Sequence, residues 1–298
     1  MVVEPKAWEH YSEEEVLEAN KLKYGNEAIV QFYEDFEESK YSYREYDVVF
    51  SAVVDMLMPH LSGSLRAVDI CGGAGKGAFT IKKCCPKAEI TLVDLSEKML
   101  GVARKRAAKE GFNDIKMVLS DAYTFLNGNK EYDIIIFSSA VHHFKDPVKL
   151  LETAARSLSP RGVIITIADP NRLKSTRRYK FFEFLATDKT NKKTIIKNLL
   201  KNGFKGKDKP DIFDVAEYQA YYGIDDLKLR KDLEESGLNA LAHIRYPAGE
   251  SYLTKIMPYF GLFWAFSFIL TPNDKYKGKE WELKHRIKRS MPFAVDLM

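Results

Sequence analysis

Residues 67–79 read AVDICGGAGKGAF and are the most informative part of the sequence for the fold. An apolar run ends in an acid, a cluster of glycines follows, and a helical segment then begins. Glycines at the carboxyl end of a first parallel strand permit a tight turn and let a ligand approach the backbone closely. The stretch therefore predicts a nucleotide-type site at that edge of a sheet. Which nucleotide it binds stays open, because Gly73, Gly75 and Ala78 also satisfy the glycine pattern of a dinucleotide-binding turn.

Short apolar runs alternate with helical segments on the C-terminal side of this turn. Strands alternating with helices predict a parallel sheet, and near-continuous apolar runs are what a strand covered on both faces needs. Two more runs follow a helical stretch at 226–237 and complete the sheet. We expect a doubly wound α/β fold with seven strands, mostly parallel and with the last strand antiparallel. The runs after the first are 89–94, 115–121, 132–139, 162–169, 238–246 and 263–271.

The flanking segments differ from this core in charge and pattern. Residues 1–64 have apolar positions at helical spacing and predict an N-terminal helical extension or lid ahead of a catalytic domain at 65–298. A basic helical insertion is expected at about 171–226, after the fifth strand. Residues 1–64 hold fourteen acids against five basic residues, whereas 171–209 hold thirteen basic residues against three acids. The two segments are therefore candidates for docking on each other.

Composition and charge narrow the partners, the metals and the cellular location to be expected of the protein. A net charge of +4 is too mild to indicate a nucleic-acid binder without a concentrated basic face. The three cysteines form neither a disulfide framework nor a zinc ligand set, so no metal is predicted. The N-terminus lacks the charge pattern of an export signal, and the most apolar stretch, 260–270, is shorter than the roughly 18 residues of a spanning helix. We expect a cytoplasmic protein. The sequence leaves its oligomeric state open, and a homodimer is one candidate.

Two acids further along the chain indicate which class of cofactor the glycine turn binds. Asp94 ends the second strand about twenty residues beyond the turn, and Asp121 followed by Ala122 ends the third. Together with Asp69 they make a series that resembles the class I S-adenosylmethionine-dependent methyltransferase family over residues 64–170. In that family the turn is typically Gly-x-Gly-x-Gly, and Cys71 stands here at the place of its first glycine.

The resemblance implies S-adenosylmethionine as the cofactor. Asp94 would accept hydrogen bonds from the ribose hydroxyls. Leu95 and Met99 would pack on the adenine, and the Asp121–Ala122 pair would recognise the adenine. The predicted cofactor-binding residues are thus Asp69, Cys71, Gly73, Gly75, Asp94, Leu95, Met99, Asp121, Ala122 and Ser138. Each acid has an alternative interpretation as a helix cap or turn cap.

The segment FSSAVHHF, residues 137–144, places two histidines after the fourth strand, beside the expected position of the methyl group. His142 or His143 can act as a general base, because an imidazole titrates near neutral pH. The alternative is that neither is catalytic, since orientation and desolvation of the nucleophile can supply much of the rate.

We predict transfer of a methyl group to a small-molecule nucleophile, with oxygen favoured over nitrogen or carbon. The fourth strand ends in FSSA and lacks the Asn-Pro-Pro-Tyr run of enzymes that methylate planar amines. The rival hypotheses are an NAD-dependent oxidoreductase, a non-catalytic binding protein of the same fold and an RNA methyltransferase. No clear nucleic-acid partner is indicated.

The acceptor is expected to be aromatic, anionic or lipid-like. Aromatic residues of both flanks can form a lid, and basic residues of the insertion can attract an anionic group or membrane surface. The alternatives are ordinary helix packing and a solvated charged face. The residues concerned are Tyr41, Tyr43, Tyr46, Phe181, Phe182 and Phe184, with Arg172, Lys174, Arg177 and Arg178.

Overall fold

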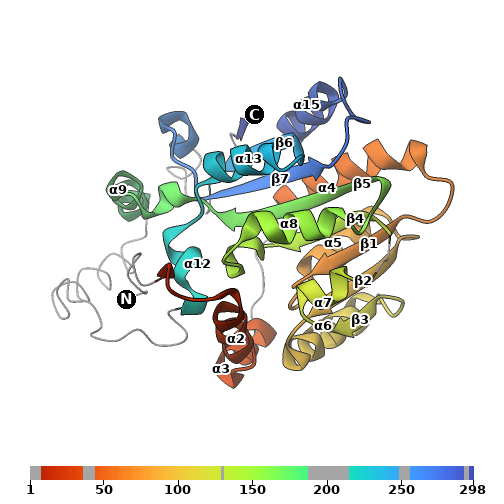
Figure 1. Ribbon diagram of the computed structural model, residues 1–298, viewed down its shortest axis with the longest axis horizontal. Helices are drawn as coiled ribbons and strands as arrows, with labels where there is room; N and C mark the ends of the chain where they lie inside the picture. The colour runs from red at the N-terminus through yellow and green to blue at the C-terminus, as the bar shows by residue number, and fades with distance from the viewer. Residues whose placement is uncertain (1–7, 36–43, 129–130, 187–214, 248–255, 292–294) are drawn as a thin grey trace.

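A computed structural model describes residues 8–35, 44–128, 131–186, 215–247, 256–291 and 295–298 of the chain (Figure 1). Its centre is one eight-stranded sheet with the strand order β3-β2-β1-β4-β5-β7-β6-β8. The strands are β1 (Arg66–Ile70), β2 (Glu89–Asp94), β3 (Lys116–Leu119), β4 (Tyr132–Ser138), β5 (Leu158–Pro170), β6 (Asn239–Tyr246), β7 (Ala265–Thr271) and β8 (Asp296–Leu297).

The strand directions confirm the predicted α/β class. Strands β1 to β5 pair in parallel, and β7 runs antiparallel between β5 and β6. The sheet gains one strand that the sequence did not predict, because β8 at the C-terminal end pairs antiparallel with β6. A two-residue strand is too short to leave a period-2 pattern in the sequence.

Helices cover both faces of the sheet. One face packs against α4 (Arg44–Leu57), α5 (Lys76–Cys84), α6 (Glu97–Glu110) and α15 (Glu280–Ser290). The other face packs against α7 (Ala122–Leu126), α8 (Pro147–Ala155) and α13 (Asp226–Glu235). Neighbouring residues of a strand enter opposite cores, as Ile134 and Ile135 of β4 do.

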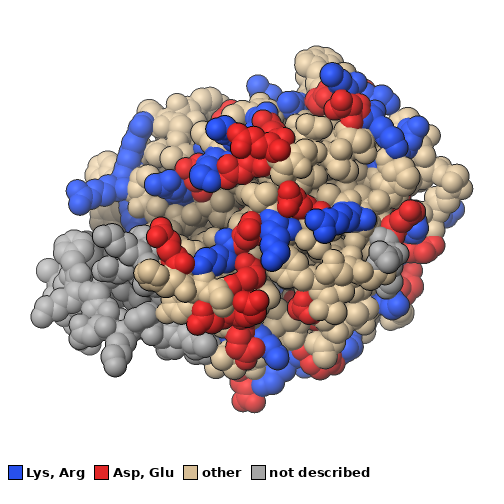
Figure 2. Space-filling view, viewed as in Figure 1, with Lys and Arg blue, Asp and Glu red and all other residues tan. Residues whose placement is uncertain are grey.

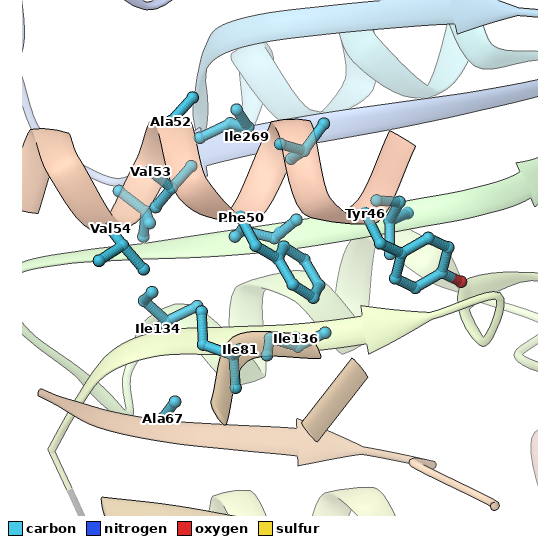
Figure 3. Packing of buried hydrophobic residues seen from close by; sticks show 14 of the residues in the cluster. Tyr46, Phe50, Ala52, Val53, Val54, Ala67, Ile81, Ile134, Ile136 and Ile269 are labelled. Atoms are coloured by element: carbon cyan, nitrogen blue, oxygen red, sulfur yellow. The ribbon is translucent and has the colours of Figure 1, made fainter. Parts of the chain in front are cut away.

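The helix α4 lies within the main core although it belongs to the predicted N-terminal extension. Phe50 and Val53 are fully buried and lie over Ile134 and Ile136 of β4, while Tyr46 lies at the end of the same row (Figure 3). Whether residues 1–64 form a unit separate from 65–298 stays a prediction.

The flanking segments meet at the carboxyl edge of the parallel strands. The N-terminal α2 (Glu13–Tyr24) and α3 (Glu27–Asp35) reach this edge, as does the short helix α12 (Tyr218–Tyr222) of the insertion (Figure 1). The short 3-10 turns of this region are η3 (Val141–His143), η4 (Arg172–Ser175) and η5 (Met257–Phe260), and η2 (Met58–His60) follows α4. The insertion after β5 is confirmed in its described parts, which also include α9 (Arg177–Ala186).

The two flanks touch, but in the described residues their opposite net charges are not what joins them. Trp8 stacks on Tyr218 with ring centroids 4.5 Å apart, within a small apolar cluster to which both flanks contribute. The one ion pair described there joins Lys23 to Glu217, with the basic residue on the acidic flank. The basic residues at 187–209, and also Tyr41 and Tyr43, lie outside the described residues.

Within the described ranges, no helix is long and apolar enough to cross a membrane.

Candidate functional site

Backbone strain marks one edge of the sheet. Cys71, Ser139 and Ala168 have φ angles of 55°, 51° and 64°, in the left-handed region that non-glycine residues rarely adopt. They lie at the carboxyl ends of β1, β4 and β5, which are adjacent in the sheet. Strained residues of this kind persist where the surrounding structure holds them, and they cluster at functional sites. The candidate site therefore lies at this edge, where the sequence predicts it.

The buried carboxyl group of Asp69 stabilises the conformation of the glycine turn. Its side chain is completely buried, and its Oδ2 accepts a hydrogen bond of 2.7 Å from the Ala78 amide at the start of α5. A Cβ at Gly77 would lie 2.7 Å from this oxygen, and one at Gly72 would lie 3.0 Å from it. Burial raises the pKa of Asp69 to about 7. The two glycines are therefore required by the close approach of the carboxyl group to the backbone.

Cys71 takes the left-handed conformation that a glycine would adopt without strain. Burial, together with the nearby charges of Asp94, Asp69 and Asp121, raises the pKa of the Cys71 thiol well above its usual value. The thiol therefore stays protonated and is a poor nucleophile. The same three carboxyl groups make the site acidic.

Asp94 ends β2 beside the turn. Its Oδ2 accepts a hydrogen bond of 2.9 Å from the Gly73 amide, and its Oδ1 accepts one of 2.8 Å from the Ser96 amide. Burial raises its pKa to about 6. A carboxylate offers about four lone-pair positions, so Asp94 keeps acceptor capacity for a ligand.

The other predicted cofactor residues line the same region. Asp121 is half-buried and caps α7 by accepting a hydrogen bond of 2.9 Å from the Thr124 amide, while Ala122 behind it is buried. Leu95 is half-buried, and Met99 is buried in a cluster with Ala74. The capping interpretation of Asp121 thus holds in this structure, and a half-buried carboxylate can also accept from a ligand.

These residues fit S-adenosylmethionine. The molecule offers two vicinal ribose hydroxyls and an exocyclic amine as donors, and it carries a sulfonium cation. Asp94 and Asp121 supply acceptors at the ends of neighbouring strands, and the acidic surroundings of Cys71 favour a cation. Among the described residues no group of three or more acids, histidines or cysteines can hold a metal ion.

The helices α2 and α3 cover the cofactor region. Val30 and Tyr33 pack on the Met99 cluster, and the Ser96 hydroxyl donates a hydrogen bond of 2.9 Å to the Tyr24 carbonyl. Ion pairs join Glu27 and Glu34 of α3 to Lys98 and Lys105 of α6. The two helices thus cover this part of the edge, and their action as a lid stays a prediction.

The two histidines have different partners. His142 is buried, and its Nδ1 lies 3.0 Å from Asp169 Oδ1 at the end of β5. His143 Nε2 lies 3.0 Å from the Tyr24 hydroxyl of α2. Burial, followed by the charges of His142 and Lys23, lowers the pKa of His143 well below its usual value. His142 therefore has an acidic partner of the kind that orients a catalytic base, whereas His143 is held neutral.

Comparison with known proteins now identifies the family. A family model described as a methyltransferase domain matches residues 61–209, which is half of the chain. The chain belongs to this family. The predicted class, a class I S-adenosylmethionine-dependent methyltransferase, is confirmed, and so is the cofactor. The nicotinamide alternative is thereby set aside, while the roles of the individual residues stay predictions.

Curated relatives cover only part of this methyltransferase. The mitochondrial 2-methoxy-6-polyprenyl-1,4-benzoquinol methylase of Caenorhabditis elegans is 32% identical over 102 residues, which are 33% of this chain and 35% of the relative. The ubiquinone/menaquinone biosynthesis C-methyltransferase UbiE of Dinoroseobacter shibae is 29% identical over 117 residues, 39% of this chain and 46% of the relative. The chain thus spans less than half the length of these two relatives.

A solved structure supports the fold over more of the chain. The plantazolicin methyltransferase BamL, in complex with a triazolic desmethylPZN analog and SAH, aligns with a TM-score of 0.54 at 16% identity. The alignment covers 88% of this methyltransferase and 97% of BamL. At this level of identity the likeness shows the shared fold.

The structure adds site residues that the sequence analysis did not select. Asp169 of β5 binds His142, and Asn20 of α2 donates a hydrogen bond of 3.0 Å from Nδ2 to the His143 carbonyl. The hydroxyl of Tyr46 lies 2.9 Å from that of Ser138, which joins α4 to the end of β4. A signal for Asp169 was present, because it closes the apolar run GVIITIAD as Asp69 and Asp94 close theirs. No sequence signal marks Asn20.

Proposed function

We propose that this methyltransferase acts on a small molecule that carries a hydroxyl group, and that His142 takes the proton of that hydroxyl. The observation that carries the proposal is the buried pair of His142 and Asp169 at the strained edge of β4 and β5. A base oriented by a carboxylate is the arrangement that activates weak nucleophiles. A methyltransferase that only positions an already reactive acceptor does not need it.

The geometry of the pair supports a different role for each of the two ring nitrogens in this proposal. With Asp169 ionised, its carboxylate accepts from Nδ1 of His142, and this fixes the tautomer in which Nε2 carries the lone pair. The His142 amide lies 3.2 Å from the same carboxylate oxygen, so both the ring and its backbone are held. Nε2 is then the nitrogen available to accept a proton from a substrate.

The cofactor side of the reaction follows from the carboxylates of the turn. S-adenosylmethionine supplies an electrophilic methyl group when bound. Asp94 and Asp121 would hold its ribose and adenine, and the lid formed by α2 and α3 would exclude water from it. Ser138 and Ser139 at the end of β4 would lie between the cofactor and the acceptor.

Oxygen is the acceptor atom that we favour, with a ring carbon as the second candidate. The names of the two curated relatives, a benzoquinol methylase and a C-methyltransferase, favour carbon. Removing the proton from a phenolic hydroxyl raises electron density on the oxygen and on the neighbouring ring carbon. The His142–Asp169 pair therefore suits either outcome.

The test is an acceptor screen with catechols and hydroquinones of increasing alkyl length. Mass spectrometry with fragmentation separates methylation on oxygen from methylation on carbon. We expect His142→Gln and Asp169→Asn to lower kcat by about 10²- to 10⁴-fold, the usual contribution of a general base, without weakening cofactor binding. His143→Gln is the matched control and should keep most of the activity. Unchanged kcat in His142→Gln would contradict the proposal.

A further inference from the structure

Aromatic side chains are exposed where α9 meets η5. Phe181 of α9 is 59% exposed, and Tyr259 and Phe260 of η5 are 79% and 46% exposed. Two arginines, Arg177 and Arg178, lie one turn before Phe181 on the same helix and are also exposed. We call these five residues the α9–η5 patch.

The two elements of the patch form one surface. The rings of Phe182 and Phe260 stack with centroids 5.6 Å apart and so join α9 to η5. Beneath them Tyr179, Met257 and Leu262 form a buried cluster of their own. This packed cluster therefore supports the exposed rings and keeps α9 and η5 side by side.

The charge of the patch and of its surroundings on α9 is positive. Residues 172–186 contain five basic residues against the single acid Glu183. Figure 2 shows Lys and Arg side chains gathered at the end of the molecule where Figure 1 places α9. In the described part of the chain neither Arg177 nor Arg178 pairs with a carboxylate, whereas Arg172 pairs with Asp225 at 3.0 Å.

We propose that the α9–η5 patch docks on the surface of a bilayer that contains anionic phospholipid. Aromatic rings insert at the level of the headgroups, where one side is apolar and the other wet, and arginines attract the negative surface potential. Phe181 supplies the apolar contribution to binding, and the two arginines on the same helix supply the electrostatic contribution. Unpaired bases of an RNA also stack on exposed rings beside arginines, so RNA binding is the outcome from which the experiment must separate vesicle binding.

The experiment is co-sedimentation of the full chain with phosphatidylcholine vesicles, with and without phosphatidylglycerol. We expect binding that requires phosphatidylglycerol and weakens as salt is raised. Arg177→Gln combined with Arg178→Gln should weaken binding by about fivefold for each arginine. Phe181→Ser combined with Tyr259→Ser should weaken it without changing its dependence on salt.

Matched controls come from α15, which lies at the other end of the sheet. Trp281 there is 72% exposed, and Lys288 and Arg289 are exposed as well. Trp281→Ser, and Lys288→Gln combined with Arg289→Gln, should leave vesicle binding unchanged, and circular dichroism should show all variants folded. Equal losses in the α15 variants, or no binding of the parent chain to anionic vesicles, would overturn the proposal. So would binding of RNA, but not of vesicles, through the same arginines.

Discussion

Asp69 makes the stability of the protein depend on pH. Burial raises its folded-state pKa to about 7 from 3.8. A carboxyl group with a raised pKa contributes stability below its unfolded pKa, and this stability is lost as the pH rises through the folded pKa. We expect the cofactor-free protein to lose stability as the pH rises from about 4 to about 7, between the unfolded and the folded pKa of Asp69.

Asp69→Asn should remove much of this pH dependence, because an amide keeps an oxygen acceptor for the Ala78 amide without the buried charge. Thermal melts of the variant and the parent across this pH range would measure the change in pH dependence. The difference in Tm between variant and parent should grow in favour of the variant as the pH rises. A constant difference would mean that Asp69 does not titrate in this range.

Substitutions of Cys71 test whether its left-handed backbone conformation strains the turn. Its φ of 55° suits glycine and is hardest for a β-branched residue. We expect Cys71→Gly to change the free energy of unfolding by less than about 1 kcal/mol, since relief of strain offsets lost packing. Cys71→Val should destabilise by about 1–3 kcal/mol. Denaturant unfolding measures both, with Cys71→Ser as the control of similar size, and equal stability of the Gly and Val variants would contradict the account.

At the scale of elements, α2 is held over the site by Asn20. The side chain is 2% exposed, and its Nδ2 donates to the carbonyls of Val16 and His143. Asn20→Ala leaves the His143 carbonyl without this donor and should cost about 1–2 kcal/mol of local stability. Hydrogen exchange of α2 should then accelerate by about tenfold, and the cofactor should dissociate faster.

The control lies on the same helix. Leu22 is 48% exposed, so Leu22→Ala changes α2 without touching the site. Its exchange and cofactor dissociation should match those of the parent chain. If Asn20→Ala behaved like Leu22→Ala, α2 would not act as a lid.

The sequence predicts the core elements well because their signals are local. The run EITLVD at 89–94 corresponds to β2 residue for residue, as predicted. Ser96, after the end of this strand, caps α6 by accepting a hydrogen bond from the Met99 amide. The ends of other strands differ where pairing with a neighbour decides them. Thus β5 begins at Leu158, four residues before its predicted start, because Leu158 pairs with Tyr132.

What the sequence could not predict depends on contacts between distant segments. Asp169 is visible as an acid after a strand, but its pairing with His142 requires the register of β4 beside β5. Tyr24 reaches His143 across 119 residues of sequence. Such contacts follow from tertiary packing, which leaves no period in a single sequence.

At the scale of the whole molecule, the boundary of the N-terminal extension can be tested by truncation. Removal of residues 1–43 deletes α2 and α3 but keeps α4, and we expect cooperative unfolding with weaker cofactor binding. Removal of residues 1–64 also deletes α4 and exposes the apolar face that Phe50 and Val53 cover. That chain should fail to unfold cooperatively. Equal cooperativity of the two truncated chains would contradict this expectation.

The central claim is that Asp94 and the glycine turn form the S-adenosylmethionine site, and titration calorimetry tests it most directly. The parent chain should bind S-adenosylmethionine in the micromolar range and should not bind NAD. Affinity should fall as the pH drops below about 6, where Asp94 becomes protonated. Asp94→Asn should bind about ten to a hundred times more weakly and lose this pH dependence, whereas the control Asp232→Asn, at a half-buried position on α13, should match the parent. Binding of NAD instead, or an Asp94→Asn variant with parental affinity and pH profile, would contradict the account.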